Sequence, residues 1–436
     1  MVCLTDFPIL GASFNMGIMK TNAFIRFILW GAFLMVGGFS LFAQELGNNY
    51  ITVSGVVRDK QTNKKLVSVN VSIPQTTIGT VTNADGYFSI KVKDSLQAKN
   101  LEFSHIGYAN MLYPLTKKDI EKAEIFLIPN TNVLAEVTVM GGDARGIVEE
   151  AIDKIAMNYP AKENLLTGFY REVIQKKKRY INISEAVVHI FKTPYTRGFE
   201  HDRVQVFKGR KLLSQKAGDT LVVKLEGGPN LSLYIDLIKN QELLLDKAEM
   251  ENYSFRFGEP VMIDNRPHHQ VNFQPRLLLP YALYYGSLYI DKETTAITRA
   301  EFNLSMDDRS KATQAMLRKK PFGLRFKPEQ MTFLVAYKQH DGRSYLNYVR
   351  NEVRFKCDWK RRLFSTSYTV FSEMVVTDRK EDDFSRISYK ESFKSGHSLS
   401  DKVGNFYDED FWGGYNIIEP TESLENAVNK LKKQYK

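Results

Sequence analysis

The sequence predicts a mainly β protein with a small N-terminal β unit and a larger C-terminal α+β domain, which has a curved antiparallel sheet and a few helices. Apolar and polar residues alternate over residues 67–73, as in a strand with one buried face. Asp341-Gly342 lies between two long β-forming runs and is typical of a hairpin turn. Aromatic residues make up 12% of the chain, which favours strands over helices.

Length and charge set the first limits on function. With 436 residues the chain can form two domains, each with its own core. The formal net charge is +10, but the basic residues are spread along the chain apart from short runs such as Lys176–Arg179 and Lys360–Arg362. No nucleic-acid motif accompanies the charge, so nucleic acid is not an expected partner. Each basic run is interpreted as a solvated strand end or as a peripheral contact with acidic lipid headgroups.

Residues 1–43 have the features of a signal peptide. Lys20 and Arg26 precede an apolar core, and a small-residue cleavage site follows at Ser40–Ala43. Met19 is an alternative start to Met1, which would make residues 1–18 an upstream extension. An uncleaved anchor is the other interpretation, but the apolar run is short and contains two glycines. We expect export to the periplasm or to the periplasmic face of the outer membrane.

The cysteines argue against lipid attachment and against a disulfide. No cysteine follows the apolar core, so a lipoprotein is not expected. Cys3 leaves with the leader, and Cys357 then remains as a single thiol without a disulfide partner. We interpret Cys357 as a buried strand residue.

Three motifs of the N-terminal unit occur in a characteristic order. They are Ser54–Asp59 (SGVVRD), Gly79–Phe88 (GTVTNADGYF) and Phe103–Tyr108 (FSHIGY). Together they resemble the carboxypeptidase-regulatory-like (transthyretin-like) domain common in exported Bacteroidetes proteins. The resemblance implies a seven-strand, prealbumin-like β-sandwich over residues 50–129, used as an interaction module. Ser68-Val69 replaces the Gly-Ala pair that is frequent in that family, a difference that affects packing at most.

Residues 130–142 are predicted to be a linker before the second domain, residues 143–436. Leu134–Val139 resembles the segment that follows this domain in outer-membrane TonB-dependent receptors. A linker strand with a glycine hinge at Gly141-Gly142 is the simpler interpretation. The resemblance leaves an envelope scaffold or receptor accessory open as an alternative function.

Helix signals and strand-like runs define the second domain. Helices are expected at residues 143–159, 231–238 and 308–318 and at the C-terminus, with caps at Asp143 and Thr421. Consecutive β-forming runs fill most of the remainder and predict a curved open sheet or half-barrel. Residues 378–405 are polar and are expected to form a loop.

A hairpin over residues 286–302 is similar to hairpins of LolA/LolB-like lipoprotein carriers. The adjoining apolar run, Leu277–Tyr289, either fills the core or lines a cavity for an acyl chain or peptide. A lipid or lipoprotein carrier with a half-barrel cavity is therefore a second alternative function.

Motifs for catalysis are absent from the sequence. No histidine has a glutamate three positions later, and His268-His269 would point to opposite faces of a strand. The chain has no G-x-S-x-G pentad, phosphate loop or dinucleotide turn. The acid clusters at residues 307–308 and 381–383 lie in turn-like sequence.

The sequence therefore predicts no catalytic, cofactor-binding or metal-ligating residues and no cofactor. We expect an exported, non-enzymatic binding protein of the cell envelope that contacts an envelope protein or a lipid. A hydrolase with a site assembled from scattered residues is the third alternative.

Overall fold

The computed structural model describes residues 49–130, 143–221, 223–225, 227–359, 364–405 and 411–435. The predicted leader, residues 131–142 of the connector and the Lys360–Arg362 run lie outside these ranges. Residues 50–436 form one compact unit, and the predicted division into two domains stays a prediction. No helix in the described ranges is long and apolar enough to span a membrane.

Seven short strands form the N-terminal β unit. They are β1 (Tyr50–Asp59), β2 (Asn70–Ser72), β3 (Gly79–Val81), β4 (Tyr87–Lys93), β5 (Asn100–Ser104), β6 (Met111–Pro114) and β7 (Ile120–Leu127). The strand orders are β4-β1-β7 and β3-β2-β5-β6, with β1 and β7 parallel. A single apolar core lies between the two sheets, with Phe88 and Phe103 in edge-to-face contact at 5.0 Å between ring centroids.

Two local predictions for this unit have different outcomes. The turn before β4 forms as expected, with Gly86 at φ 74°, where a residue without Cβ is least strained. The alternation over residues 67–73 correctly places Val69, Val71 and Ile73 in the core. The regular strand is shorter than predicted, however, because Ser68 adopts φ 57° and interrupts the extended chain.

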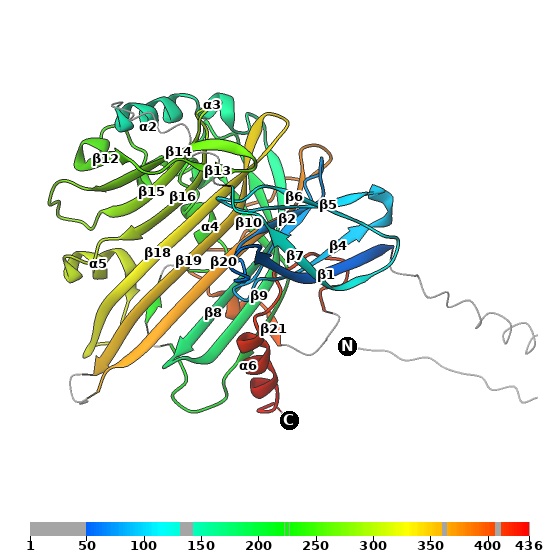
Figure 1. The fold of residues 1–436 in the computed structure, drawn as a ribbon. Coiled ribbons are helices and arrows are strands. Elements are labelled where there is room, and N and C mark those ends of the chain that lie inside the picture. Colours follow the sequence, from blue (N-terminus) through cyan, green and yellow to red (C-terminus); the bar gives the residue numbers. More distant parts are fainter. Residues whose placement is uncertain are drawn as a thin grey trace, which may run out of the picture. The chain divides into compact units, whose positions relative to one another are not determined.

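A large curved sheet dominates the rest of the chain (Figure 1). Its strands are β8 (Asn164–Lys176), β9 (Arg179–Lys192), β10 (Arg203–Leu213), β12 (Tyr253–Phe257), β13 (Val261–Ile263), β14 (Arg266–Pro275), β15 (Tyr284–Asp291), β16 (Ile297–Leu304), β18 (Leu324–His340), β19 (Arg343–Trp359), β20 (Thr366–Lys380) and β21 (Gly404–Asn405). The order is β12-β14-β15-β16-β18-β19-β20-β8-β9-β10-β21, with β13 beside β14. All pairs are antiparallel except β10 with β21.

The longest hairpin confirms the strongest turn signal. Asp341 and Gly342 join β18 to β19 with φ 47° and 74°, and His340 pairs with Arg343 across the turn. The two-residue turn sets the register of the longest strand pair in the sheet. A small separate pair, β11 (Lys224–Leu225) with β17 (Leu317–Lys319), lies outside this sheet.

Five α-helices accompany the sheets in the described ranges: α2 (Ala144–Asp153), α3 (Ile155–Asn158), α4 (Leu231–Tyr234), α5 (Arg309–Met316) and α6 (Glu422–Lys432). Asp143, Asp308 and Thr421 cap α2, α5 and α6 by accepting hydrogen bonds from backbone N–H groups. The first predicted helix is divided at Lys154, and α4 is shorter than predicted. Short 3₁₀ turns occupy Asp94–Leu96, Phe199–His201, Gln241–Leu243, Met250–Asn252 and Leu399–Asp401.

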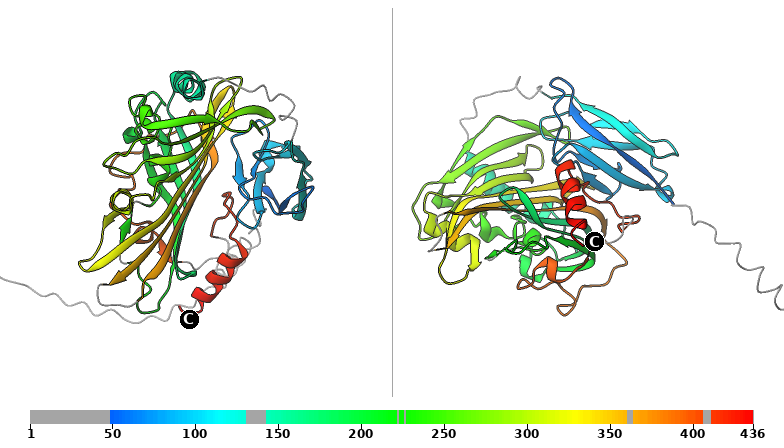
Figure 2. Two further views of the ribbon diagram at one scale, coloured as in Figure 1. Left: turned by 60° about the vertical axis from the view of Figure 1, so that its left-hand side comes forward. Right: turned by 90° about the horizontal axis from the view of Figure 1, so that it is seen from below.

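The large sheet has two differently covered faces (Figure 2). On the inner face, Tyr170 and Ile174 of β8 join one large core with α2, α3, α5 and the chain around α4. On the outer face, Phe169 packs with Trp412 and Val81, while Val173 packs against α6. This alternation along β8 follows from the two-residue period of a strand. The mainly β fold class, with two small sheets and one large curved sheet, is confirmed.

Gly286 is a position in the large sheet where we predict that a single methyl group is costly. A Cβ there would overlap the carbonyl oxygen of Glu301 and the Cα of Phe302 on the neighbouring strand. We expect Gly286→Ala to lower the free energy of unfolding by about 1–3 kcal/mol, the usual cost of overpacking. Urea denaturation measures the change. Gly404→Ala is the control, because nothing lies within 4 Å of a Cβ at that position.

Candidate ligand-binding site

A cavity of about 560 Å³ opens on the inner face of the large sheet, a volume typical of small-molecule sites. We call it the inner cavity. Its apolar wall contains Val204, Leu231, Leu233, Tyr284, Met331 and Phe393. All six are buried except the half-buried Tyr284. The wall is assembled from β10, α4, β15, β18 and the segment after β20.

The segment after β20 closes one side of the inner cavity. The backbone N–H of Phe393 donates to the carbonyl of Val204 at 2.6 Å, and Asn230 Nδ2 donates to the carbonyl of Phe393 at 2.9 Å. Phe393 and Leu399 are buried in the main core. The predicted loop at residues 378–405 is therefore largely irregular, as expected, but it is also part of the core and of the cavity wall.

Three basic side chains line the same cavity. Arg203 Nη1 donates to the carbonyl of Asp202 at 2.7 Å, and Arg318 Nη1 donates to the carbonyl of Ser395 at 2.9 Å. Lys394 Nζ lies 3.2 Å from the ring centroid of the exposed Tyr389. Within the described ranges, neither Arg203 nor Lys394 has a carboxylate within 4 Å. The inner cavity thus combines an apolar wall with positive charge.

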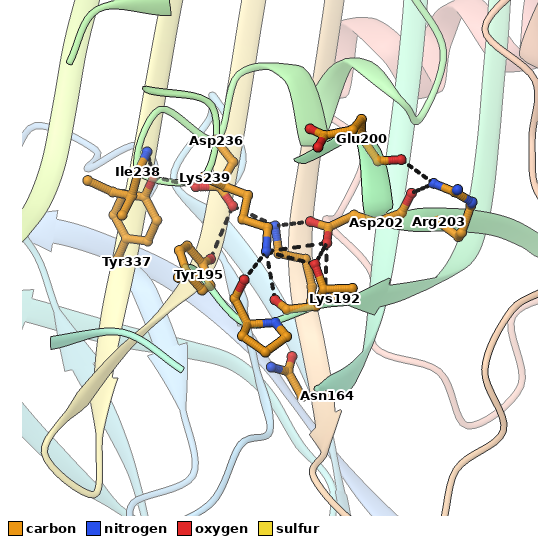
Figure 3. Close-up of polar contacts among 12 residues, drawn as sticks. Asn164, Lys192, Tyr195, Glu200, Asp202, Arg203, Asp236, Ile238, Lys239 and Tyr337 are labelled. Atoms are coloured by element: carbon orange, nitrogen blue, oxygen red, sulfur yellow. Dashed lines mark hydrogen bonds and ion pairs between the residues drawn. The ribbon is translucent and has the colours of Figure 1, made fainter. Parts of the chain in front are cut away.

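A buried ion network lies beside Arg203 (Figure 3). Lys192 Nζ lies 2.7 Å from Asp236 Oδ2 and 2.9 Å from Asp202 Oδ2. Lys239 Nζ lies 3.6 Å from Asp202 Oδ1 and donates to the Thr193 carbonyl at 2.8 Å. Thr193 in turn donates to Asp202 Oδ1 from both its N–H and its hydroxyl, each at 2.9 Å. All four charged side chains are at most 1% exposed.

Two tyrosines complete the network around Asp236. Tyr195 and Tyr337 donate their hydroxyls to the two carboxylate oxygens at 3.1 and 2.7 Å. Burial, reinforced by the charge of Asp236, raises the pKa of both tyrosines well above its ordinary value, so the hydroxyls stay protonated and donate. Asp236 therefore connects β9, the chain after α4 and β18.

The two lysines of the network differ in their electrostatics. Burial would lower the pKa of Lys192, but Asp202 and Asp236 outweigh it and raise that pKa. Burial lowers the pKa of Lys239 to about 8, because Asp202 compensates it only in part. With both lysines protonated, two positive and two negative charges balance in the interior. The balanced network fixes Asp202 and thereby the backbone of the next residue, Arg203. The side chain of Arg203 points away from the network (Figure 3).

Lys239 predicts a specific pH dependence of stability. Its pKa is about 8 when folded against an ordinary value of 10.5, so the unfolded chain holds this proton more tightly. Raising the pH from about 8 to 10 therefore removes a penalty on the folded state and favours folding. We expect the free energy of unfolding of the wild type to rise across this window relative to that of Lys239→Met. Urea titrations at several pH values, with the exposed Lys247→Met as control, measure it; parallel curves for wild type and Lys239→Met would contradict the prediction.

A second cavity of about 550 Å³ lies on the outer face, beside the Asn83–Asp85 turn. Part of the charge that lines it is compensated, because Glu352 lies 2.5 Å from Arg354 and 3.7 Å from Arg350. Its lining also includes the exposed Lys177 and Lys178.

The structure separates the residues of the predicted apolar run Leu277–Tyr289. Leu283 and Leu288 are buried in the core, whereas Tyr284 lines the inner cavity and Leu278 is 94% exposed. Some residues of the run thus fill the core and one lines a cavity, as the two interpretations of the run proposed. The core accounts for more of its residues than the cavity does.

The histidine pair and Cys357, which were also singled out in the sequence, lie in strands of the large sheet. His268 is buried with Nδ1 2.8 Å from the carbonyl of Arg266, while His269 is only half-buried. Cys357 is buried in β19, and burial raises its pKa to about 11. In the part of the chain that the structure describes, no three His, Cys, Asp or Glu residues are grouped so that they could hold a metal ion.

Sequence reasoning missed the residues that define the site. Lys192 and Lys239 were not singled out because lysine is almost always exposed. Asp236 and Lys239 lie in the apolar run Leu231–Asn240, and two charges in such a run are the signal that could have indicated burial. Arg203 and Lys394 are nearly 200 positions apart and carry no shared motif.

Comparisons with known proteins give one curated relative, several solved structures and one family model. The TonB-dependent receptor SusC of Bacteroides thetaiotaomicron is 32% identical over 114 residues, which are 26% of this chain and 10% of the receptor. This chain thus matches about a tenth of the length of that relative.

The comparison with solved structures gives matches of low sequence identity and low TM-score. A putative outer membrane lipoprotein-sorting protein domain from Vibrio parahaemolyticus is 14% identical, with 55% of this chain and 93% of that chain covered and a TM-score of 0.24. A DUF1329 family protein from Desulfovibrio piger is 12% identical over 55% and 93% of the two chains, with a TM-score of 0.23. A LolA superfamily protein from Nitrosomonas europaea is 12% identical over 56% and 96%, with a TM-score of 0.19.

The sequence model of one family matches the N-terminal β unit. It is the CarboxypepD_reg-like domain, over residues 53–139. This range contains all three motifs on which the resemblance was based, and the predicted family is confirmed. Residues 53–139 of this chain therefore match the CarboxypepD_reg-like domain family.

Proposed function

We propose that this protein is a non-enzymatic binding protein of the cell envelope that holds an anionic amphiphile in the inner cavity. The ligand class is an acyl chain that ends in a carboxylate or phosphate. The observation that carries the proposal is the combination of a buried apolar wall with Arg203, Arg318 and Lys394 around one cavity of about 560 Å³. The acyl chain would contact the wall, and the acidic group would bind the cations.

The charges around the cavity favour an acid over a neutral lipid. Of the two lining carboxylates, Asp202 is committed to the buried lysines, and Glu200 lies 3.2 Å from His201. Arg203 and Lys394 donate to backbone carbonyls, which leaves their positive charge uncompensated by a carboxylate in the described ranges. An acidic headgroup would supply the missing negative charge.

Binding of palmitate and of palmityl alcohol to purified protein tests the proposal by displacement of a fluorescent fatty acid. We expect the wild type to bind palmitate more tightly than the alcohol. Arg203→Gln with Lys394→Gln should weaken palmitate binding by about tenfold, corresponding to one or two charge-assisted hydrogen bonds, and should leave the alcohol unchanged. Arg256→Gln is the matched control, because Arg256 is exposed on β12 and does not line the cavity.

A second variant tests the location of the acyl chain. Ala315 lines the cavity from α5 and is exposed, so a tryptophan there occupies cavity volume without displacing the core. Ala315→Trp should weaken binding of the acid and the alcohol alike. Equal binding of both ligands by the wild type and all variants would refute the inner cavity as the site.

A scaffold or receptor accessory in the envelope is the second candidate function. The observation that favours it is the similarity of 114 residues of this chain to a TonB-dependent receptor. Crosslinking in envelope fractions followed by purification of the protein tests it. A reproducible outer-membrane protein partner would support this function, and recovery of the protein alone would exclude it.

A further inference from the structure

The β8–β9 turn and the connection before β18 lie at the same end of the large sheet (Figure 1). Trp359 at the end of β19 pairs with Leu324, which places the turn before β18 beside it. Tyr368 near the start of β20 pairs with Lys176 at the end of β8. The β8–β9 turn, the connection before β18 and the residues that flank the β19–β20 connection therefore share this end, which we call the basic tip.

The basic tip exposes large aromatic side chains. Phe322, two positions before β18, is 96% exposed. Phe364, two positions before β20, is 82% exposed. Trp359 is 36% exposed beside them. Aromatic side chains that protrude from neighbouring turns are unfavourable in water and favourable in the interfacial region of a bilayer.

The same end carries a surplus of positive charge. Lys177, Lys178, Lys319 and Arg325 are exposed, and none of them pairs with a carboxylate within the described parts of the chain. The nearby acids are already paired, since Asp219 holds Lys176 and Arg179, and Asp358 holds Lys327. The charge complements an anionic surface.

The β8–β9 turn keeps two of these charges at a conformational cost. Lys177 and Lys178 have φ 50° and 64°, the left-handed region that favours Asn and Gly in two-residue hairpins. The β18–β19 hairpin at the opposite end has Asp341-Gly342 in the same conformation, and the β13–β14 turn has Asp264-Asn265. Lysines at strained positions indicate a role other than folding.

We propose that the basic tip docks this protein onto an anionic lipid bilayer. Phe322 and Phe364 insert at the headgroup level, and the surrounding lysines and arginine contact lipid phosphates. The docking surface is separate from the inner cavity, so it does not depend on the proposed ligand.

Co-sedimentation with vesicles of phosphatidylcholine, with and without phosphatidylglycerol, tests the proposal. We expect binding only when phosphatidylglycerol is present, and a decrease as salt is raised. Phe322→Ser with Phe364→Ser should reduce partitioning by at least about tenfold, the loss expected for two interfacial aromatic anchors. Equal binding to both kinds of vesicle, or unchanged binding by this variant, would overturn the proposal.

The strained turn supplies a variant that separates docking from folding. Lys177→Asn with Lys178→Gly should stabilise the fold, because both residues suit the turn, and should weaken vesicle binding by about tenfold or more. Lys117→Gln with Lys118→Gln removes two exposed charges from the N-terminal unit and should leave vesicle binding unchanged. Ala315→Trp should also bind vesicles as the wild type does. If the Lys177/Lys178 and Lys117/Lys118 variants lost vesicle binding equally, the net charge of the protein and not a particular surface would determine binding. That result would contradict the proposal.

Discussion

Asp236→Asn is expected to lower the free energy of unfolding by about 3–5 kcal/mol, the usual effect of breaking a buried ion pair. The substitution keeps the size of the side chain but leaves Lys192 and Lys239 with Asp202 as their one remaining carboxylate. A surplus positive charge would then lie in the interior, and Tyr195 and Tyr337 would lose a charged acceptor. Urea denaturation followed by circular dichroism measures the loss.

The matched control for Asp236 is an exposed ion pair. Asp153 lies 2.6 Å from Lys247, but its side chain is 68% exposed. Asp153→Asn should therefore cost about 0–1 kcal/mol. Similar losses for the two variants would contradict a special role for the buried network.

Arg171→Met is the second substitution expected to have a large effect. Arg171 is 2% exposed and lies 2.8 Å from Glu185 and 3.3 Å from Glu373. Its guanidinium also donates to the carbonyls of Ile418 at 2.7 Å and Glu419 at 3.3 Å. Removing it leaves two buried carboxylates with less compensation, and we expect a loss of about 3–5 kcal/mol.

Arg171→Met should also loosen a particular segment. The chain before α6 is held from the other side by Thr80 Oγ1, which donates to the carbonyl of Ile417 at 2.8 Å, and by Asn83 Nδ2, which donates to the carbonyl of Pro420 at 2.9 Å. Without Arg171 we expect faster amide exchange and proteolysis around residues 415–420. Arg350→Met, which removes a half-exposed partner of Glu352, is the control and should leave this segment protected.

Local signals in the sequence predicted local structure well. Asp143 and Thr421 cap helices as expected, and Asp341-Gly342 forms the expected hairpin, because caps and tight turns depend on a few neighbouring residues. The strand around residues 67–73 shows the limit of this reasoning. Its burial pattern was right, but the backbone of Ser68 interrupts the extended chain, and the regular strand begins only at Asn70.

The candidate site could not be predicted because its residues meet only in the folded chain. Lys192 ends β9, Asp236 follows α4 and Tyr337 lies in β18, and no sequence spacing relates them. The basic tip could not be predicted for the same reason. The sequence shows separate basic runs, and only the strand register places Lys177 and Phe322 at one end of the sheet.

Native mass spectrometry of the protein isolated from the envelope of its own host tests the central claim most directly. We expect the spectrum to contain the protein with a bound species. Solvent extraction should release this species, and its mass should identify an acyl chain with a carboxylate or phosphate. The same preparation of Ala315→Trp should lack it. A wild-type protein that is recovered without ligand, or with a neutral lipid only, would contradict the claim that the inner cavity binds an anionic amphiphile.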